Sequence, residues 1–132
     1  MDKNEFSNAR IRLGKTQAQM AALLGASLKA VQSYEQGWRP VPAHAERQVL
    51  FLLSLRPNRK RPKSCWVVRK CSDEKRRTCP AWELKVGRFC WFINGTVCEG
   101  KAQRDWQAKM TICRSCAVMK SLLGGERRGF YA

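Results

Sequence analysis

Apolar residues between positions 16 and 37 recur with the spacing of two short helices. In the first helix they stand at i, i+3 and i+4, as Met20, Leu23 and Leu24. In the second helix Val31 and Tyr34 stand at i and i+3 and are expected to face inward. The residues expected to face outward are Lys29, Gln32 and Ser33. The pattern predicts two amphipathic helices that bury one shared face and leave a polar face on the second helix.

Capping residues stand at the ends of both predicted helices. Thr16 and Ser27 carry hydroxyl groups that can accept hydrogen bonds from the first free N–H groups of a helix. Gly25 and Gly37 follow the last residues of the two patterns, where a left-handed C-cap requires glycine. Two short helices joined by a glycine turn are the organisation of a helix-turn-helix, whose second helix can enter a DNA major groove.

These residues resemble the Cro/CI–XRE family of phage-repressor-like regulators over roughly residues 5–55. The resemblance is carried by Thr16, Gln17, Ala21, Gly25, Val31, Glu35 and Gly37. It implies that Gln17 contacts a phosphate. It also implies base reading by Leu28, Lys29 and Ser33, with Gln32 beside them. Leu28 departs from the usual polar residue, so it either contacts a thymine methyl group or reads no base.

Two further helices are expected around this pair. Residues 5–13 carry Phe6, Ala9 and Leu13 at helical spacing, with Arg10 either at a phosphate or in solvent. Residues 43–55 are expected to pack through Val49, Leu52 and Leu53. The segment at 38–42, between the second helix of the pair and residues 43–55, contains two prolines and is expected to hold Arg39 near the DNA backbone. The predicted DNA-contacting residues are Gln17, Ser27, Leu28, Lys29, Gln32, Ser33 and Arg39.

The charge of the chain favours an anionic partner. It has 26 basic and 10 acidic residues, a formal net charge of +16. Residues 56–63 contain five basic residues and two prolines and are predicted to be a basic linker, either a solvated spacer or an arm along DNA. Most of the charge lies outside residues 1–55, so DNA affinity should fall steeply with salt. There is no apolar run near 18 residues, which argues against a membrane.

All seven cysteines lie between positions 65 and 116. The first ten residues lack the apolar segment of a secretion signal, so the chain is expected to be cytoplasmic. In a reducing compartment a dense cysteine cluster indicates a metal site more often than disulfides. The predicted ligands, four of which would be used, are Cys65, Cys71, Cys79, Cys90, Cys98, Cys113 and Cys116. Any one of them can instead be a small core residue, as we expect for two or three.

Cys113 and Cys116 form the firmest predicted ligand pair, because two residues separate them. They precede a predicted helix at 117–123, whose positive end should lower thiol pKa, and follow another at 104–112, where Trp106 and Met110 share a face. Thiolates select zinc or an iron–sulfur cluster. The spare thiols favour the cluster, because they can serve as alternative ligands or as oxidation targets.

Residues 64–123 resemble a second family, the cysteine-rich two-CW domain. The resemblance rests on Cys65-Trp66 with Cys71, Cys79-Pro80-Ala81, Cys90-Trp91, Gly95-Thr96 with Cys98, and Cys113 with Cys116. It implies an accessory module and supplies no activity. The tryptophans are expected to form a miniature core rather than platforms that stack bases; they are Trp66, Trp82, Trp91 and Trp106. Residues 124–132 are expected to form a flexible basic tail.

The sequence therefore predicts a mainly α protein, with an N-terminal helix-turn-helix bundle at 1–55 and a small cysteine-rich, metal-stabilised domain at 64–123. The expected function is sequence-specific, DNA-binding transcriptional regulation, by a homodimer, with redox sensing through an iron–sulfur or zinc module. The alternative is an antitoxin-like autoregulating protein, whose zinc module grips a toxin partner. An enzyme is not expected, because no Ser/His/Asp set, paired carboxylates or phosphate loop is present.

Overall fold

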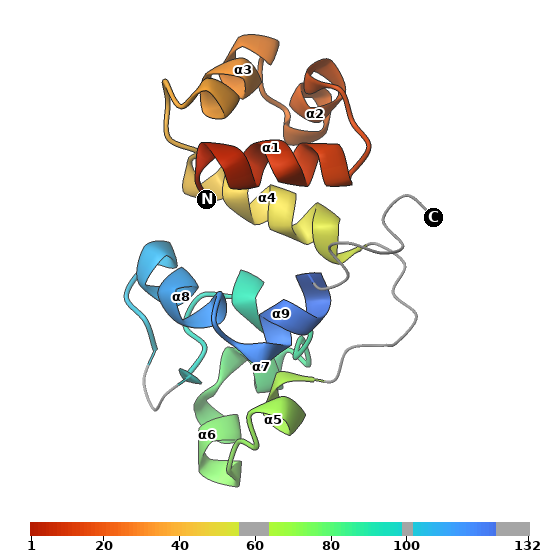
Figure 1. The fold of residues 1–132 in the computed structure, drawn as a ribbon. Coiled ribbons are helices and arrows are strands. Elements are labelled where there is room, and N and C mark those ends of the chain that lie inside the picture. The colour runs from red at the N-terminus through yellow and green to blue at the C-terminus, as the bar shows by residue number, and fades with distance from the viewer. Residues whose placement is uncertain (56–63, 99–101, 124–132) are drawn as a thin grey trace. The chain divides into compact units, whose positions relative to one another are not determined.

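The computed structural model describes residues 1–55, 64–98 and 102–123 (Figure 1). These residues are mainly α-helical, and no strand occurs among them. They divide into two compact units, residues 1–55 and the described residues from 64 onward, and each unit is described by itself. The predicted linker at 56–63 and the predicted tail at 124–132 lie outside the described residues.

The first unit contains four helices, drawn in red to yellow in Figure 1: α1 (Lys3–Arg12), α2 (Gln17–Leu24), α3 (Leu28–Gln36) and α4 (Ala43–Ser54). Both α1 and α2 pack against α3 and against α4. The helices predicted at 5–13 and 43–55 are therefore present. The first begins two residues earlier than predicted, because the Asp2 side chain accepts a hydrogen bond from the Glu5 N–H at 2.8 Å and caps it.

The capping residues act as the sequence predicted. The Thr16 hydroxyl accepts from the Gln19 N–H at 3.1 Å, and the Ser27 hydroxyl accepts from the Ala30 N–H at 3.0 Å. The Gln19 side chain also accepts from the Thr16 N–H, which completes a capping box. Gly25 and Gly37 end α2 and α3 with φ of 63° and 80°, the left-handed region that favours glycine.

Apolar side chains from the four helices form the core of the first unit. Phe6, Met20 and Val31 are fully buried, and Phe6 meets Tyr34 edge to face, with ring centroids 5.5 Å apart. Val49 and Leu53 of α4 are buried with them, as predicted, whereas Leu52 is only half-buried. One face of α3 is thus buried against its neighbours α1 and α2.

Two predictions about inward and outward positions were wrong. Leu23 is 46% exposed, because the face that α2 turns inward runs through Met20, Ala21 and Leu24. Ser33 is buried rather than outward-facing, because the inward stripe of α3 is wide enough to include it beside Tyr34. Counting at i, i+3 therefore misassigned one residue in each of the two helices.

The second unit is built from shorter helices. They are α5 (Cys65–Val68), α6 (Asp73–Thr78), α7 (Pro80–Glu83), the 3-10 helix η1 (Cys90–Phe92), α8 (Trp106–Cys113) and α9 (Ala117–Leu123). The helix predicted at 104–112 begins at Trp106, since the Asp105 carboxylate accepts from the Ala108 N–H at 2.8 Å and fixes the start. The helix at 117–123 lies where it was predicted. No helix in the two described stretches of this unit, or in residues 1–55, is long and apolar enough to cross a membrane.

Trp91 is the central side chain of the second unit. It is almost fully buried and meets Phe92 edge to face at 5.8 Å, while Met110 and Val118 are buried in the same unit. Trp106 and Met110 are both buried, in agreement with the face predicted for them. Of the four tryptophans predicted to form the core, Trp91 and Trp106 are buried. The other two, Trp66 and Trp82, are half-buried and line a pocket.

Candidate nucleic-acid interface and cysteine-lined pocket

The outward face of α3 is polar except for one leucine. Lys29 and Gln32 are exposed, and Leu28 is 44% exposed. Ala30, Val31 and Tyr34 of the same helix are buried. Ser27 precedes them as the exposed N-cap. The first two turns of α3 therefore present a connected set of side chains to solvent. Five DNA-contacting residues were predicted on this helix or at its cap. Four of them are in this exposed set, and the fifth, Ser33, is buried.

Glu35 ties three helices of the first unit together. Its carboxylate, which is 7% exposed, accepts hydrogen bonds from the Arg10 guanidinium of α1 and from the Gln17 side-chain amide of α2. Arg10 also donates to the Lys15 carbonyl oxygen at 2.9 Å. The side chain predicted to contact phosphate, Gln17, is thus held by α3 within this chain. The same contacts fix the start of α2 relative to α3.

The segment after α3 exposes an aromatic ring and a cation. The N–H groups of Trp38 and Arg39 donate to the Ser33 carbonyl oxygen at 3.0 and 3.3 Å. Their side chains are exposed, that of Trp38 to 80%. Backbone contacts therefore keep Arg39 close to the end of α3, which is compatible with its predicted position beside a DNA backbone.

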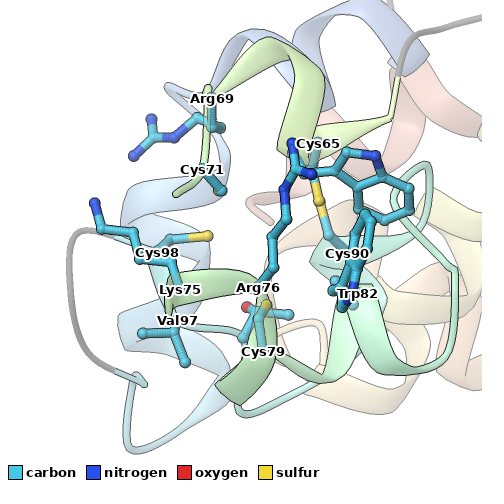
Figure 2. Close-up of a pocket in the computed structure, with 13 residues that line it drawn as sticks. Cys65, Arg69, Cys71, Lys75, Arg76, Cys79, Trp82, Cys90, Val97 and Cys98 are labelled. Atoms are coloured by element: carbon cyan, nitrogen blue, oxygen red, sulfur yellow. The ribbon is translucent and has the colours of Figure 1, made fainter. Parts of the chain in front are cut away.

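In the second unit, five cysteines line one cavity of about 90 Å³ (Figure 2). They are Cys65, Cys71, Cys79, Cys90 and Cys98. Basic side chains share the lining, from Arg69, Lys75 and Arg76, together with the rings of Trp66 and Trp82. The two cysteines predicted most firmly as a pair, Cys113 and Cys116, are not among the lining residues.

Local structure places Cys65 and Cys90 opposite one another. The Cys65 N–H donates to the Gly87 carbonyl oxygen at 2.8 Å, which anchors the start of α5, and Cys90 is the first residue of η1. Gly87 is required here, because a Cβ atom would stand 2.7 Å from the Trp66 ring and 3.0 Å from the Cys65 nitrogen. Both thiols are buried, at 8% and 6% exposure. Figure 2 shows their sulfur atoms turned toward each other.

The contact between these two thiols makes them chemically unequal. Their side-chain hydrogen bond lowers the pKa of Cys65 to about 7, against 9.0 for an ordinary thiol. The same hydrogen bond, together with burial, raises the pKa of Cys90. Of the two thiols, Cys65 therefore ionises more readily.

The other thiols with a defined shift have raised pKa values. Burial raises the pKa of Cys71, Cys98 and Cys113. The prediction that a helix end lowers the pKa of Cys113 was wrong, because Cys113 is the last residue of α8 and is buried there. The positive end of α9 begins four residues later and does not dominate at this thiol.

Lys109 supplies a buried positive charge beside the thiols. It is 3% exposed, and its ammonium group donates a hydrogen bond to the Thr96 hydroxyl. Its charge lowers the pKa of Cys65 further and acts against the rise that burial causes at Cys90, Cys98 and Cys113. No carboxylate in the described ranges forms an ion pair with Lys109. Sequence reasoning missed this residue, because a lone lysine in a basic chain carries no signal.

The rim of the pocket is aromatic and basic. The Trp66 and Trp82 rings meet edge to face, with centroids 4.9 Å apart. The Lys85 ammonium lies 3.4 Å and the Arg76 guanidinium carbon 4.7 Å from the Trp82 centroid. Cations over a ring face are stabilised by the negative potential of the π system. These contacts hold the positive charges of Lys85 and Arg76 against the Trp82 ring.

The described cysteines are not gathered into groups of three or more metal-ligating side chains. Within residues 1–55, 64–98 and 102–123, no group of three Cys, His, Asp or Glu side chains could hold a metal ion. A structural zinc or an iron–sulfur cluster requires four such ligands. Five thiols line the pocket, and a side-chain hydrogen bond joins two of them, Cys65 and Cys90. The iron–sulfur or zinc centre therefore stays a prediction from the sequence.

Comparisons with known proteins found no relative of this chain. No family model, no curated protein and no solved structure matches the chain. The resemblances to the Cro/CI–XRE family and to the two-CW domain accordingly rest on the residues that carry them.

Proposed function

We propose that this protein is a sequence-specific DNA-binding regulator of transcription, in which α2 and α3 act as a helix-turn-helix and α3 enters the major groove. The observation that carries the proposal is the division of α3 into two faces. Ala30, Val31 and Tyr34 are buried, whereas Leu28, Lys29 and Gln32 are exposed on the first two turns. A recognition helix reads bases with the residues of its N-terminal turns, so the free face is where contacts are needed.

The dimensions and chemistry of α3 suit this role. Its nine residues span about 13 Å, and a B-DNA major groove is about 12 Å wide. In the proposed complex the Lys29 ammonium donates to guanine O6 or N7, and the Gln32 amide pairs with adenine N6 and N7. Leu28 contacts a thymine methyl group or reads no base. We leave Ser33 out of the reading set, because its side chain is buried.

Residues around α3 supply the contacts to the sugar–phosphate backbone. Arg39 is exposed directly after α3, and the chain carries a net charge of +16. Gln17 contributes by bonding to Glu35, which keeps the start of α2 in register with α3. A phosphate contact from Gln17 itself requires its amide to leave Glu35 or to use its second N–H. Binding should weaken steeply as salt rises.

A second copy of the chain completes the proposed reader. One short recognition helix contacts only a few base pairs and supplies limited discrimination. Two copies related by a twofold axis would read two half-sites about one helical turn apart. The proposal therefore includes a homodimer on a pseudo-palindromic operator.

Selection from a random duplex library, followed by gel shifts at physiological salt, tests the proposal. The selected sequence should bind at least ~10³-fold more tightly than unrelated DNA. Lys29→Ala should lose about 1–3 kcal/mol of discrimination at one base pair. Lys120→Ala is the matched control, because it removes the same charge from an exposed position on α9. The proposal fails if no sequence is enriched, or if the two variants lose affinity equally.

Gln17→Ala is a second variant that tests the proposed complex. Because Gln17 positions the helix pair and faces no base, the variant should weaken binding to every sequence alike. A loss confined to one base position would instead make Gln17 a base reader, and the arrangement of helices on DNA would have to be revised.

A further inference from the structure

The cavity of the second unit is lined by cations and by no described carboxylate. Arg69, Lys75 and Arg76 all contribute to its wall. No aspartate or glutamate occurs among the described lining residues, and no described carboxylate forms an ion pair with any of the three cations. Like charges around one small cavity repel each other unless an anion lies between them. The DNA-binding role proposed for α3 does not use this group of cations.

Arg76 has the most closely defined position of the three. Its guanidinium carbon lies 4.7 Å from the centroid of the Trp82 ring, and Figure 2 shows its side chain extended along the pocket. Its Nε atom is buried and has no hydrogen-bond partner among the described residues. Stacking on a ring occupies the face of a guanidinium and leaves the N–H groups at its edge able to donate. A buried donor without an acceptor costs free energy, which an acceptor bound in the cavity would recover.

A fourth positive charge lies behind the wall of the cavity. Thr96 lines the cavity and is 3% exposed, and its hydroxyl accepts a hydrogen bond from the ammonium group of Lys109. Lys109 is equally buried, and no described carboxylate forms an ion pair with it. A buried ammonium group is costly unless an anion or several acceptors compensate it. An anion beside Thr96 would be one side chain away from this charge.

The size of the cavity and its open side limit which anion can bind. Its volume is about 90 Å³, several times the roughly 10–15 Å³ that holds one water molecule. Arg69 and Lys75 are exposed, so the cavity meets solvent where they line it. A small tetrahedral oxyanion suits these limits. Its oxygens can accept hydrogen bonds from several charged donors at once, and as a dianion it carries more charge than a carboxylate.

We propose that this cavity binds a phosphate-type dianion, which is either the free ion or the phosphate group of a small ester that extends out past Arg69 and Lys75. Arg76 donates from its edge to the oxygens, and Arg69 and Lys75 supply positive charge at the open side. Lys109 adds its charge from behind Thr96. Because the ligand binds the folded chain, it should also stabilise the second unit against unfolding. The inference concerns the second unit alone and does not rest on DNA binding.

Isothermal titration calorimetry of the full chain, in a phosphate-free chloride buffer with a thiol reductant, tests the site. The probes are inorganic phosphate, phenyl phosphate and adenosine monophosphate, and at least one of them should bind saturably. Arg76→Gln should weaken this binding by about tenfold or more, the usual result of losing a hydrogen bond to a charged group. Arg77→Gln is the matched control, because it removes the same charge from an exposed position on α6 that does not line the cavity. It should weaken binding less than about twofold, since exposed charges are screened by salt.

Lys75→Gln is a second variant, which keeps the test valid if Arg76→Gln fails to fold. Lys75 is exposed, so its loss leaves the packing intact, and it should weaken binding more than Arg77→Gln does. Circular dichroism of each variant should show an unchanged helical content. Equal losses in the lining variants and in Arg77→Gln would overturn the proposal, because binding would then reflect net charge alone.

The three probes distinguish the two sources of the phosphate group. Inorganic phosphate that binds at least as tightly as the esters identifies the free ion, and tighter binding of an ester identifies a phosphate-bearing small molecule. No saturable binding of any probe at millimolar concentration would overturn the proposal. So would zinc or iron that copurifies with the chain, is held by the thiols and prevents binding of all three probes. The cations would then compensate the negative charge of a metal–thiolate centre.

Discussion

The two units differ in where their candidate functional groups lie. These groups are on the surface in the first unit and in the interior in the second. In residues 1–55, helices of 8 to 12 residues surround an apolar core, and the exposed side chains of α3 are left free. In the described part of residues 64–123, helices of 3 to 8 residues enclose three thiols, the ammonium group of Lys109, and the rings of Trp91 and Trp106. The first arrangement suits contact with a large partner. The second places five thiols on the wall of a small cavity.

The largest effect should come from the apolar core that holds α3. Phe6→Ala removes a fully buried ring that meets Tyr34, so it should lower the free energy of unfolding of the first unit by about 3–5 kcal/mol. Urea denaturation followed by circular dichroism measures this change. Leu23→Ala is the control, since Leu23 is 46% exposed and its loss should cost well under half as much. Equal losses in the two variants would show that the core has been placed wrongly.

The next effect concerns the enclosed thiols and their response to pH. Alkylation of Cys65 by iodoacetamide should reach half of its plateau rate near pH 7, because its pKa is lowered to about 7 by the hydrogen bond from Cys90. Lowering the pKa means that the thiolate persists down to that pH and is lost below it. Alkylation of Cys71, whose pKa burial raises, should still be increasing at pH 9. Parallel profiles for the two sites would contradict the contact between Cys65 and Cys90.

Gly87→Ala should disturb the second unit at the point where Cys65 is anchored. The new methyl group would stand 2.7 Å from Trp66 and 2.8 Å from Ser64, so the backbone has to shift. Overpacking of this kind costs about 1–3 kcal/mol, whereas a Gly→Ala change in open space usually stabilises. Thermal unfolding monitored by tryptophan fluorescence gives the sign. Increased stability would show that the close approach at Gly87 does not exist.

Helix caps should have the smallest effects, and nearly equal ones in the two units. Thr16→Ala removes the cap of α2, and Asp105→Ala removes the cap of α8. Each should cost about 1 kcal/mol, because each deletes one side-chain acceptor at an exposed helix start. Chemical denaturation of both variants measures the costs. A cost above about 3 kcal/mol in either would mean that the residue does more than cap its helix.

Sequence reasoning was most effective where the determinants are local. The caps Thr16, Gly25, Ser27 and Gly37 each act within a few residues of themselves, so their positions could be predicted without tertiary structure. The helix ends around them follow directly. Burial at the edge of a stripe could not be predicted, as Leu23 and Ser33 show, because it depends on how neighbouring helices roll against each other.

Less of the second unit's structure could be predicted from the sequence, and the reason is physical. The helices α5, α6 and α7 have only 4 to 6 residues, which is too few to show a helical period. Local signals were available in Ser72, which caps α6, and in Pro80, the first residue of α7. The pocket itself brings together residues from several segments.

The contact between Cys65 and Cys90 and the position of Lys109 depend on that long-range packing. The spacing of Cys113 and Cys116 predicted a ligand pair, but neither residue lines the cavity. Spacing along the chain therefore did not predict which cysteines line the cavity.

The central claim is the proposal that the exposed face of α3 reads DNA. The most direct measurement is an NMR titration of the ¹⁵N-labelled full chain with its selected duplex. The account predicts that the largest changes in amide shift fall on residues 27–33 and on Arg39, with much smaller changes across residues 64–123. Changes concentrated in the cysteine unit, with α3 unaffected, would contradict it.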